Sequence, residues 1–210
     1  MVTNLVPGSG DPYDPEWITD PERPYGSFSG AVEATWEADG RHMRLLKPLI
    51  YTDGAGVVWE APKGSCVDGA SVPRILWTLV GSPFTGKYRD ASVIHDVACV
   101  ARTRPWKVTH RAFLSAMRAS GVEVRQARKM YMGVYHFGPR WPSLEMRNVQ
   151  TINGTETIAV EVPPLPQTLT EPDVLELAAI IDAEANDPAI PIMSLEEIEN
   201  FVSKRRPTRD

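Results

Sequence analysis

Hydrophobic positions along the chain follow two periods, and each predicts a different kind of structure. In residues 30–62, short segments with alternating apolar and polar side chains are separated by turns that contain Asp-Gly. A period of two is typical of half-buried β-strands, and turns of this kind favour hairpins. We therefore expect a small antiparallel β-meander here.

After Pro83 the period becomes helical. Apolar side chains recur every three or four residues between Ala91 and Arg102, and similar stripes run through 108–120 and 122–137. This spacing places them on one face of a helix. Short connections predict that the helices are antiparallel neighbours. The chain is thus expected to have an α+β fold, with the meander followed by a three-helix cluster and extended terminal arms.

Proline content and charge divide the chain into three parts. Residues 1–26 contain five prolines, which disfavour helices and central strands, so we expect an extended arm. Residues 27–140 form the predicted α+β core domain. Residues 141–210 form an acidic, proline-rich extension, in which residues 151–162 have the composition of an extended strand.

Two short amphipathic helices are expected in this extension, at 171–185 and 194–204. The first begins at a capping threonine, Thr170, and the second at Ser194, which has Glu197 in capping-box spacing. Helices of this length are marginally stable alone. We expect them to dock on the core domain or on a neighbouring subunit.

Composition narrows the class of protein. The 210 residues are 42% hydrophobic, which is enough for one buried core. The N-terminal residues lack the basic and apolar regions of a signal peptide, and no apolar run reaches the roughly 18 residues of a membrane span. Two cysteines are too few for a disulfide framework. The sequence therefore predicts a soluble protein with reduced thiols.

Charge is distributed unevenly along the chain. Residues 74–140 carry 12 Lys/Arg against 3 Asp/Glu, whereas residues 141–210 carry 5 against 13. A basic core could face phosphates, or the acidic extension could lie on the basic surface of its own or a neighbouring chain. Because no base-stacking motif accompanies the basic residues, we do not expect nucleic-acid binding.

The candidate chemistry centres on His95 and Asp96, adjacent residues in an otherwise apolar helix. Such a pair is costly to bury without a partner or a task. Asp68 begins a compact turn upstream, so these three residues are the candidate catalytic groups. Cys99 follows His95 by four residues and shares its helical face.

The run from Gly64 to Gly138 is similar to an uncharacterised domain family that is common in tailed-phage genomes and prophages. The residues that carry this resemblance are the Asp68-Gly69-Ala70-Ser71-Val72-Pro73-Arg74 turn, Trp77, the Ala91–Asp96 helix, Phe113-x-x-Ala116-Met117, and Met130-Tyr131 to Phe137-Gly138. The resemblance implies a phage or prophage origin and association with the virion, so the protein would be made in the host cytoplasm. The terminal arms fall outside the resemblance, and we expect them to contact other virion proteins. The resemblance leaves open a homo-oligomer in the particle.

The chain departs from this family's pattern near the histidine. The family often has aromatic residues two and four positions after it, and usually an acidic residue on the next helix. Here these positions hold Val97, Cys99 and His110. The departures weaken an inherited catalytic role, but His95, Cys99 and His110 with nearby carboxylates are suitable ligands for zinc.

One hypothesis for the site is hydrolysis. The layout is similar to that of small calcium-dependent phospholipases, in which His95 would deprotonate water while Asp96 and oxygens near Asp68 hold the cation. The candidate metal ligands are thus Asp96, Asp68, His95 and His110, for calcium or zinc. The glycine-rich metal loop of those enzymes is missing. The substrate would be cell-envelope lipid or peptidoglycan.

The function that we expect from the sequence is a structural component of the virion, in the tail, baseplate or neck, built on a domain with a hydrolase-like His-Asp site; hydrolysis is the alternative. In the structural protein the same residues only order a loop. Asp68 would cap the turn, Ser71 would bond its own backbone, and Asp96 would pair with Arg74 or Arg89. A thiol nucleophile, Cys99 beside His95, is a further alternative, although a buried apolar cysteine is the commoner case.

Overall fold

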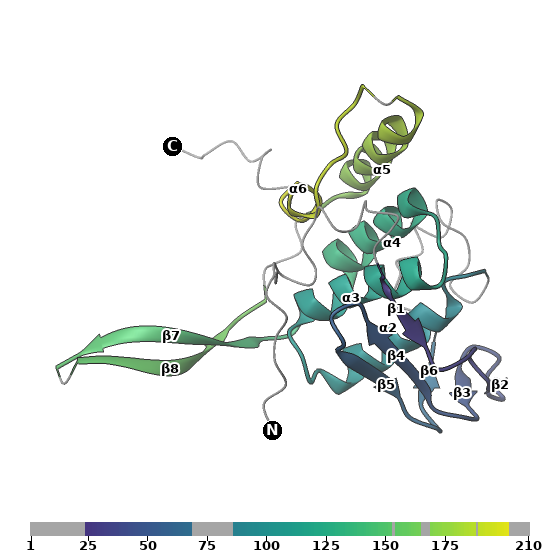
Figure 1. The fold of residues 1–210 in the computed structure, drawn as a ribbon, viewed down its shortest axis with the longest axis horizontal. Coiled ribbons are helices and arrows are strands. Elements are labelled where there is room, and N and C mark those ends of the chain that lie inside the picture. Colours follow the sequence, from purple (N-terminus) through teal and green to yellow (C-terminus); the bar gives the residue numbers. More distant parts are fainter. Residues whose placement is uncertain (1–23, 69–85, 153, 165–168, 188, 202–210) are drawn as a thin grey trace.

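The computed structural model of the protein describes residues 24–68, 86–152, 154–164, 169–187 and 189–201. Short antiparallel strands occupy the N-terminal half and helices follow (Figure 1), which confirms the α+β class. One sheet has the order β1-β4-β5 and the other the order β2-β3-β6. The strands are β1 (Gly26–Phe28), β2 (Ala34–Trp36), β3 (Met43–Leu45), β4 (Leu49–Asp53), β5 (Val58–Ala61) and β6 (Cys66–Val67).

The two sheets replace the single run of hairpins that the alternation predicts. The apolar segment 42–53 divides into β3 and β4, which pair with different neighbours. Pro48 lies between them and has no N–H to donate to a strand ladder. The segment therefore cannot continue as one strand, and its two halves enter different sheets.

Three helices, α2 (Arg89–Ala101), α3 (Trp106–Ala119) and α4 (Val124–Phe137), form the cluster predicted from the helical period. Neighbouring helices pack in sequence order, and α2 and α3 also cover the β1-β4-β5 sheet. Tyr51 of that sheet is fully buried, and its hydroxyl donates a hydrogen bond of 3.0 Å to Oγ of Ser115 on α3. The sheet and the helices thus share one core, in which α2 contacts both the sheet and α3.

A long hairpin leaves this core. Strands β7 (Ser143–Thr151) and β8 (Gly154–Val162) pair along their whole length and project away from the other elements (Figure 1). The sequence predicts only the second strand. Several large apolar side chains of the hairpin are exposed: Leu144, Met146, Val149, Ile152 and Ile158.

The C-terminal helices α5 (Glu171–Asn186) and α6 (Leu195–Glu199) pack on α4. The backbone N–H groups of Thr170 and Ser194 donate to Asp173 and Glu197, three residues on, as in a capping box. The acidic extension therefore docks on the chain's own helix α4 through α5 and α6.

Ion pairs accompany this docking. Arg128 of α4 pairs with Glu184 of α5, and both side chains are almost fully buried. Arg111 of α3 donates from Nε and Nη2 to both carboxylate oxygens of Glu199, at 2.8 and 3.0 Å. The basic core and the acidic extension thus neutralise one another at these points.

No helix in the described part of the chain combines the length and apolarity needed to cross a membrane.

Candidate metal centre

His95 and Asp96 occupy the buried middle of α2. Their exposed fractions are 1% and 7%, because α2 lies between the sheet and α3. The His95 ring contacts the Phe113 ring of α3, with 4.7 Å between ring centroids. The pair that marks the candidate site in the sequence is therefore inside the protein, and His95 faces the next helix.

His110 of α3 meets His95 across the helix interface. Nε2 of His95 and Nδ1 of His110 are 2.8 Å apart, and His110 is fully buried. The rings of Trp106 and Trp141 lie edge-on to His110 at centroid distances of 5.6 and 6.4 Å. Aromatic side chains thus fix the imidazole on two sides.

The end of α4 closes over the same ring. A Cβ atom at Gly138 would lie 2.2 Å from the carbonyl oxygen of Val134 and 3.2 Å from Cε1 of His110. These distances are too short for any side chain, so glycine permits the approach. It brings Pro139 next to the imidazole, where the Pro139 carbonyl raises the pKa of His110 against the larger effect of burial.

Cys99 completes a group of three donors. Its Sγ lies 3.5 Å from Nε2 of His95, as the spacing of four residues on one helix predicts. Donor atoms of His95, Cys99 and His110 all lie within 4.8 Å of one another, and all three residues are buried. Two imidazoles and a thiol at this distance could hold a metal ion.

Burial sets the protonation of these groups in the metal-free protein. It lowers the pKa of His95 to about 3, and it lowers the pKa of His110 well below the usual value, with His95 acting in the same direction. Burial, followed by the nearby Asp96 carboxylate, raises the pKa of Cys99 to about 12. Both imidazoles are therefore neutral at pH 7, and the thiol keeps its proton. A thiol in that state is a poor nucleophile.

A pocket of about 450 Å³ opens beside the group. Asp96, Cys99 and Arg102 line it from α2, while Asp68 and His42 line it from the strand side. The other lining residues are Cys66, Val67, Val100 and Pro139. Cys99 thus connects the buried histidines to a space that a small molecule could enter.

The structure places the remaining predicted residues in different ways. Asp68 lines the same pocket as Asp96 but is exposed, and its Oδ2 is 3.6 Å from Nη2 of Arg41. Neither aspartate belongs to the group of three donors. Ser71 and Arg74, with the rest of the Gly69–Pro73 turn, lie outside the described residues.

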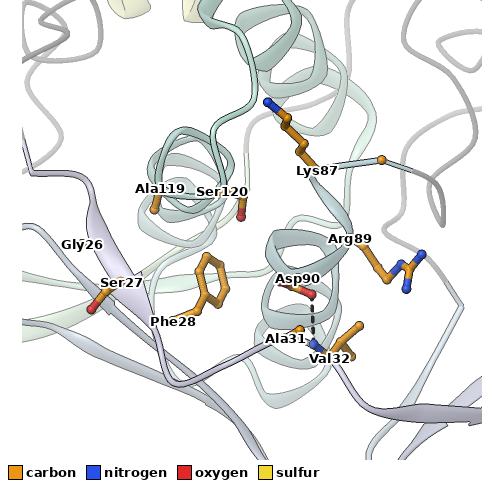
Figure 2. Close-up of a pocket in the computed structure, with 11 residues that line it drawn as sticks. Gly26, Ser27, Phe28, Ala31, Val32, Lys87, Arg89, Asp90, Ala119 and Ser120 are labelled. Carbon is orange, nitrogen blue, oxygen red and sulfur yellow. Dashed lines mark hydrogen bonds between the residues drawn. The ribbon is translucent and has the colours of Figure 1, made fainter.

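A second pocket, of about 520 Å³, lies among β1, α2 and α3 (Figure 2). Asp90 accepts a hydrogen bond of 3.1 Å from the backbone N–H of Val32 at its edge, and the side chain of Arg89 points away from the other lining residues (Figure 2). Arg89, a predicted partner of Asp96, lines this pocket, but none of the described catalytic or metal-ligand candidates does. In the described part of the chain, no group of metal donors lies beside it.

Arg102 and His42 also line the pocket, although neither is among the residues predicted for the site. Arg102 falls three residues after Cys99 on the helical stripe that the sequence shows. His42 comes to the pocket from the turn between β2 and β3, where it contacts Asp39. No local pattern links that turn to α2.

Residues 43–134 match a family that is described as a protein of unknown function (DUF1353). The match includes Asp68 and all three donors of the metal group. Among curated proteins, two uncharacterised proteins of Sinorhizobium fredii are similar to this chain. They are y4jT, 39% identical over 130 residues, and y4iH, 44% identical over 116 residues.

These alignments cover 61% and 55% of this chain but only 38% and 47% of the two relatives. The chain therefore spans less than half of the length of either relative. No solved structure matches.

Proposed function

We propose that the protein is a zinc-dependent hydrolase of a tailed-phage particle, acting on cell-envelope lipid or peptidoglycan. One observation carries the proposal: the donor atoms of His95, Cys99 and His110 converge within 4.8 Å beside a pocket of about 450 Å³. Catalytic zinc sites commonly have three protein ligands and one position that is open to water or substrate. His95, Cys99 and His110 would supply the three protein ligands.

Two of the three distances between donor atoms are close to those in a zinc site. Zn–N bonds of about 2.0–2.1 Å and Zn–S bonds of about 2.3 Å in a tetrahedron put ligand atoms roughly 3.3–3.6 Å apart. The contact between Sγ of Cys99 and Nε2 of His95 is already 3.5 Å. The contact between His95 and His110 is 2.8 Å, so those rings would separate by roughly 0.5 Å to accept the ion.

The donor types favour zinc over calcium. Calcium takes six to eight oxygen ligands, whereas imidazole and thiolate suit zinc. Both histidines are held neutral, which is the state that binds a metal, and a bound ion would displace the proton of Cys99. The Pro139 carbonyl beside His110 is the kind of partner that orients a ligating imidazole.

The pocket residues supply the rest of the chemistry. A zinc ion contributes Lewis acidity, which makes water a better nucleophile at neutral pH. Asp96 lines the same pocket next to Cys99, and its carboxylate is the group proposed to accept the proton from that water. In this scheme Asp96 acts as the base, and His95 is a ligand.

Matched cysteine variants test the proposal. Purified wild-type protein should contain about one zinc per chain and hydrolyse phospholipid vesicles or isolated peptidoglycan, and a chelator should abolish both properties. Cys99→Ser should lose zinc and activity. Cys66→Ser is the control, because Cys66 lines the same pocket but is exposed and outside the donor group. Wild-type protein without bound zinc, or a fully active Cys99→Ser variant, would contradict it.

A second candidate function is a structural component of the virion, in the tail, baseplate or neck. The hairpin β7–β8 favours it, because an isolated two-stranded hairpin is marginal in water and this one exposes Leu144, Met146 and Ile158. Neighbouring virion proteins would cover it. This proposal expects protease cleavage within 143–162 in the free protein and protection in the assembled particle. Equal cleavage in both states would count against it.

A further inference from the structure

Arg102 has an unusual backbone conformation at the edge of the candidate site. It follows the last turn of α2 with φ 52° and ψ 30°, in the left-handed region, and its N–H bonds the carbonyl of Ala98. Among the described residues it is the sole non-glycine with positive φ. Glycine is the usual residue at such a helix end, because it adopts this conformation without strain. Helix capping alone therefore gives no reason for an arginine.

The Arg102 side chain lines the metal-centre pocket together with Cys99 and Asp96. Its guanidinium carbon lies 5.9 Å from the centroid of the Trp141 ring, which offers the cation an aromatic face. Within the described part of the chain, Arg102 takes part in no ion pair. Its donors are available to a molecule that enters the pocket.

Charges around the pocket favour an anion once a divalent metal is bound. The Cys99 thiolate and the Asp96 carboxylate balance the two charges of the ion, and Arg102 then leaves an excess of positive charge. Asp68, the other acid of the pocket, lies beside Arg41 at 3.6 Å. A planar guanidinium beside a metal is well suited to a phosphate or carboxylate group.

We infer that Arg102 is the specificity-determining residue of this pocket, and that its guanidinium binds a phosphate or carboxylate group of the substrate beside the metal centre. This inference rests on the proposed function, since it adds the substrate class to the same site. The anion could be the phosphate of a lipid headgroup or the terminal carboxylate of a cell-wall peptide. The shared chemistry is an anionic oxygen pair that accepts two parallel hydrogen bonds.

Arg102→Gly is the decisive variant. Glycine tolerates φ 52° without strain, so this change removes the guanidinium while preserving the end of α2. Arg102→Lys keeps the charge but loses the bidentate fork. Arg125→Gln is the control for lost charge, because Arg125 is a half-buried residue of α4 that lies 3.6 Å from Glu123 and does not line the pocket.

The test measures binding of three probes to zinc-loaded and metal-free protein by calorimetry: inorganic phosphate, glycerol 3-phosphate and an N-acetylated dipeptide with a free carboxylate. Wild type and Arg125→Gln should bind at least one probe, and Arg102→Gly should bind it roughly ten to a hundred times more weakly. Arg102→Lys should be intermediate. Tighter binding of glycerol 3-phosphate would indicate a lipid substrate, and tighter binding of the dipeptide a peptide.

Two results would overturn the inference: no probe binds wild type, or wild type and Arg102→Gly bind all probes equally. Failure of the proposed function is distinguishable, because it appears as absent zinc or absent hydrolysis. Binding to the metal-free protein is measured in the same series, and it shows how much Arg102 contributes to binding without the metal. Zinc content of Arg102→Gly should equal that of wild type, since Arg102 is not in the donor group.

Discussion

Nε2 of His95 and Nδ1 of His110 lie 2.8 Å apart, on two helices that are otherwise joined by aromatic and apolar contacts. Two neutral imidazoles can share one hydrogen bond there, and Nε2 of His110 is buried without a hydrogen-bond partner among the described residues. The same contact holds two ligand atoms close to the separation that a metal ion requires. The proposed function follows from this arrangement together with Cys99.

The two cysteines should differ sharply in reactivity. Burial raises the pKa of Cys99 to about 12, whereas Cys66 is exposed. At pH 8 the metal-free native protein should therefore react quickly with one equivalent of a disulfide reagent such as Ellman's reagent, and with a second only after unfolding. Cys66→Ser should abolish the quick phase. A quick phase that persists in this variant would show that Cys99 is accessible.

The Arg128–Glu184 pair should contribute strongly to stability. Both side chains are almost fully buried, so Arg128→Met leaves an unpaired carboxylate inside the protein and should cost about 3–5 kcal/mol. Urea unfolding measures the change. The exposed pair Lys47–Glu33 is the control, and Lys47→Ala should cost less than about 1 kcal/mol. Comparable losses for the two variants would contradict the assigned burial.

Stability should fall in mild acid because of His136. Nε2 of His136 lies 2.8 Å from the carbonyl oxygen of Ile198 on α6, and burial lowers the pKa of His136 to about 4. The unfolded chain therefore binds a proton more readily. This contribution to stability is complete above about pH 6.5 and is lost as the pH falls toward 4.

Comparison with His136→Gln isolates this effect from that of the other buried histidines. Between pH 7.5 and pH 5 the free energy of unfolding of wild type should fall by roughly 2 kcal/mol more than that of the variant. Urea titrations at the two pH values measure the difference. Parallel losses in the two proteins would show that His136 does not titrate as assigned.

Local patterns in the sequence predict much of the site. The spacing of four residues places His95 and Cys99 on one helical face, and their contact of 3.5 Å agrees with it. Antiparallel packing of α2 and α3 brings His110 to His95, as the short connection indicates. These relationships depend on helical geometry and on one short connection, and both can be predicted from the local sequence.

Long-range relationships are not expressed in this way. The period of two does not show that β3 and β4 belong to different sheets, because strand pairing depends on contacts far along the chain. Likewise, the contrast between basic core and acidic extension suggests docking, but it does not identify Arg128 and Glu184 as partners 56 residues apart. Asp68 keeps its predicted place near Asp96 in one pocket, although it does not reach the metal group.

X-ray absorption at the zinc edge tests the central claim most directly. Protein loaded with one equivalent of zinc should show one sulfur ligand at about 2.3 Å and two imidazole nitrogens at about 2.0–2.1 Å. The sulfur should disappear in Cys99→Ser and persist in Cys66→Ser. A zinc ion surrounded only by oxygen and nitrogen in wild type, or a chain that binds no zinc, would contradict a metal centre at His95, Cys99 and His110.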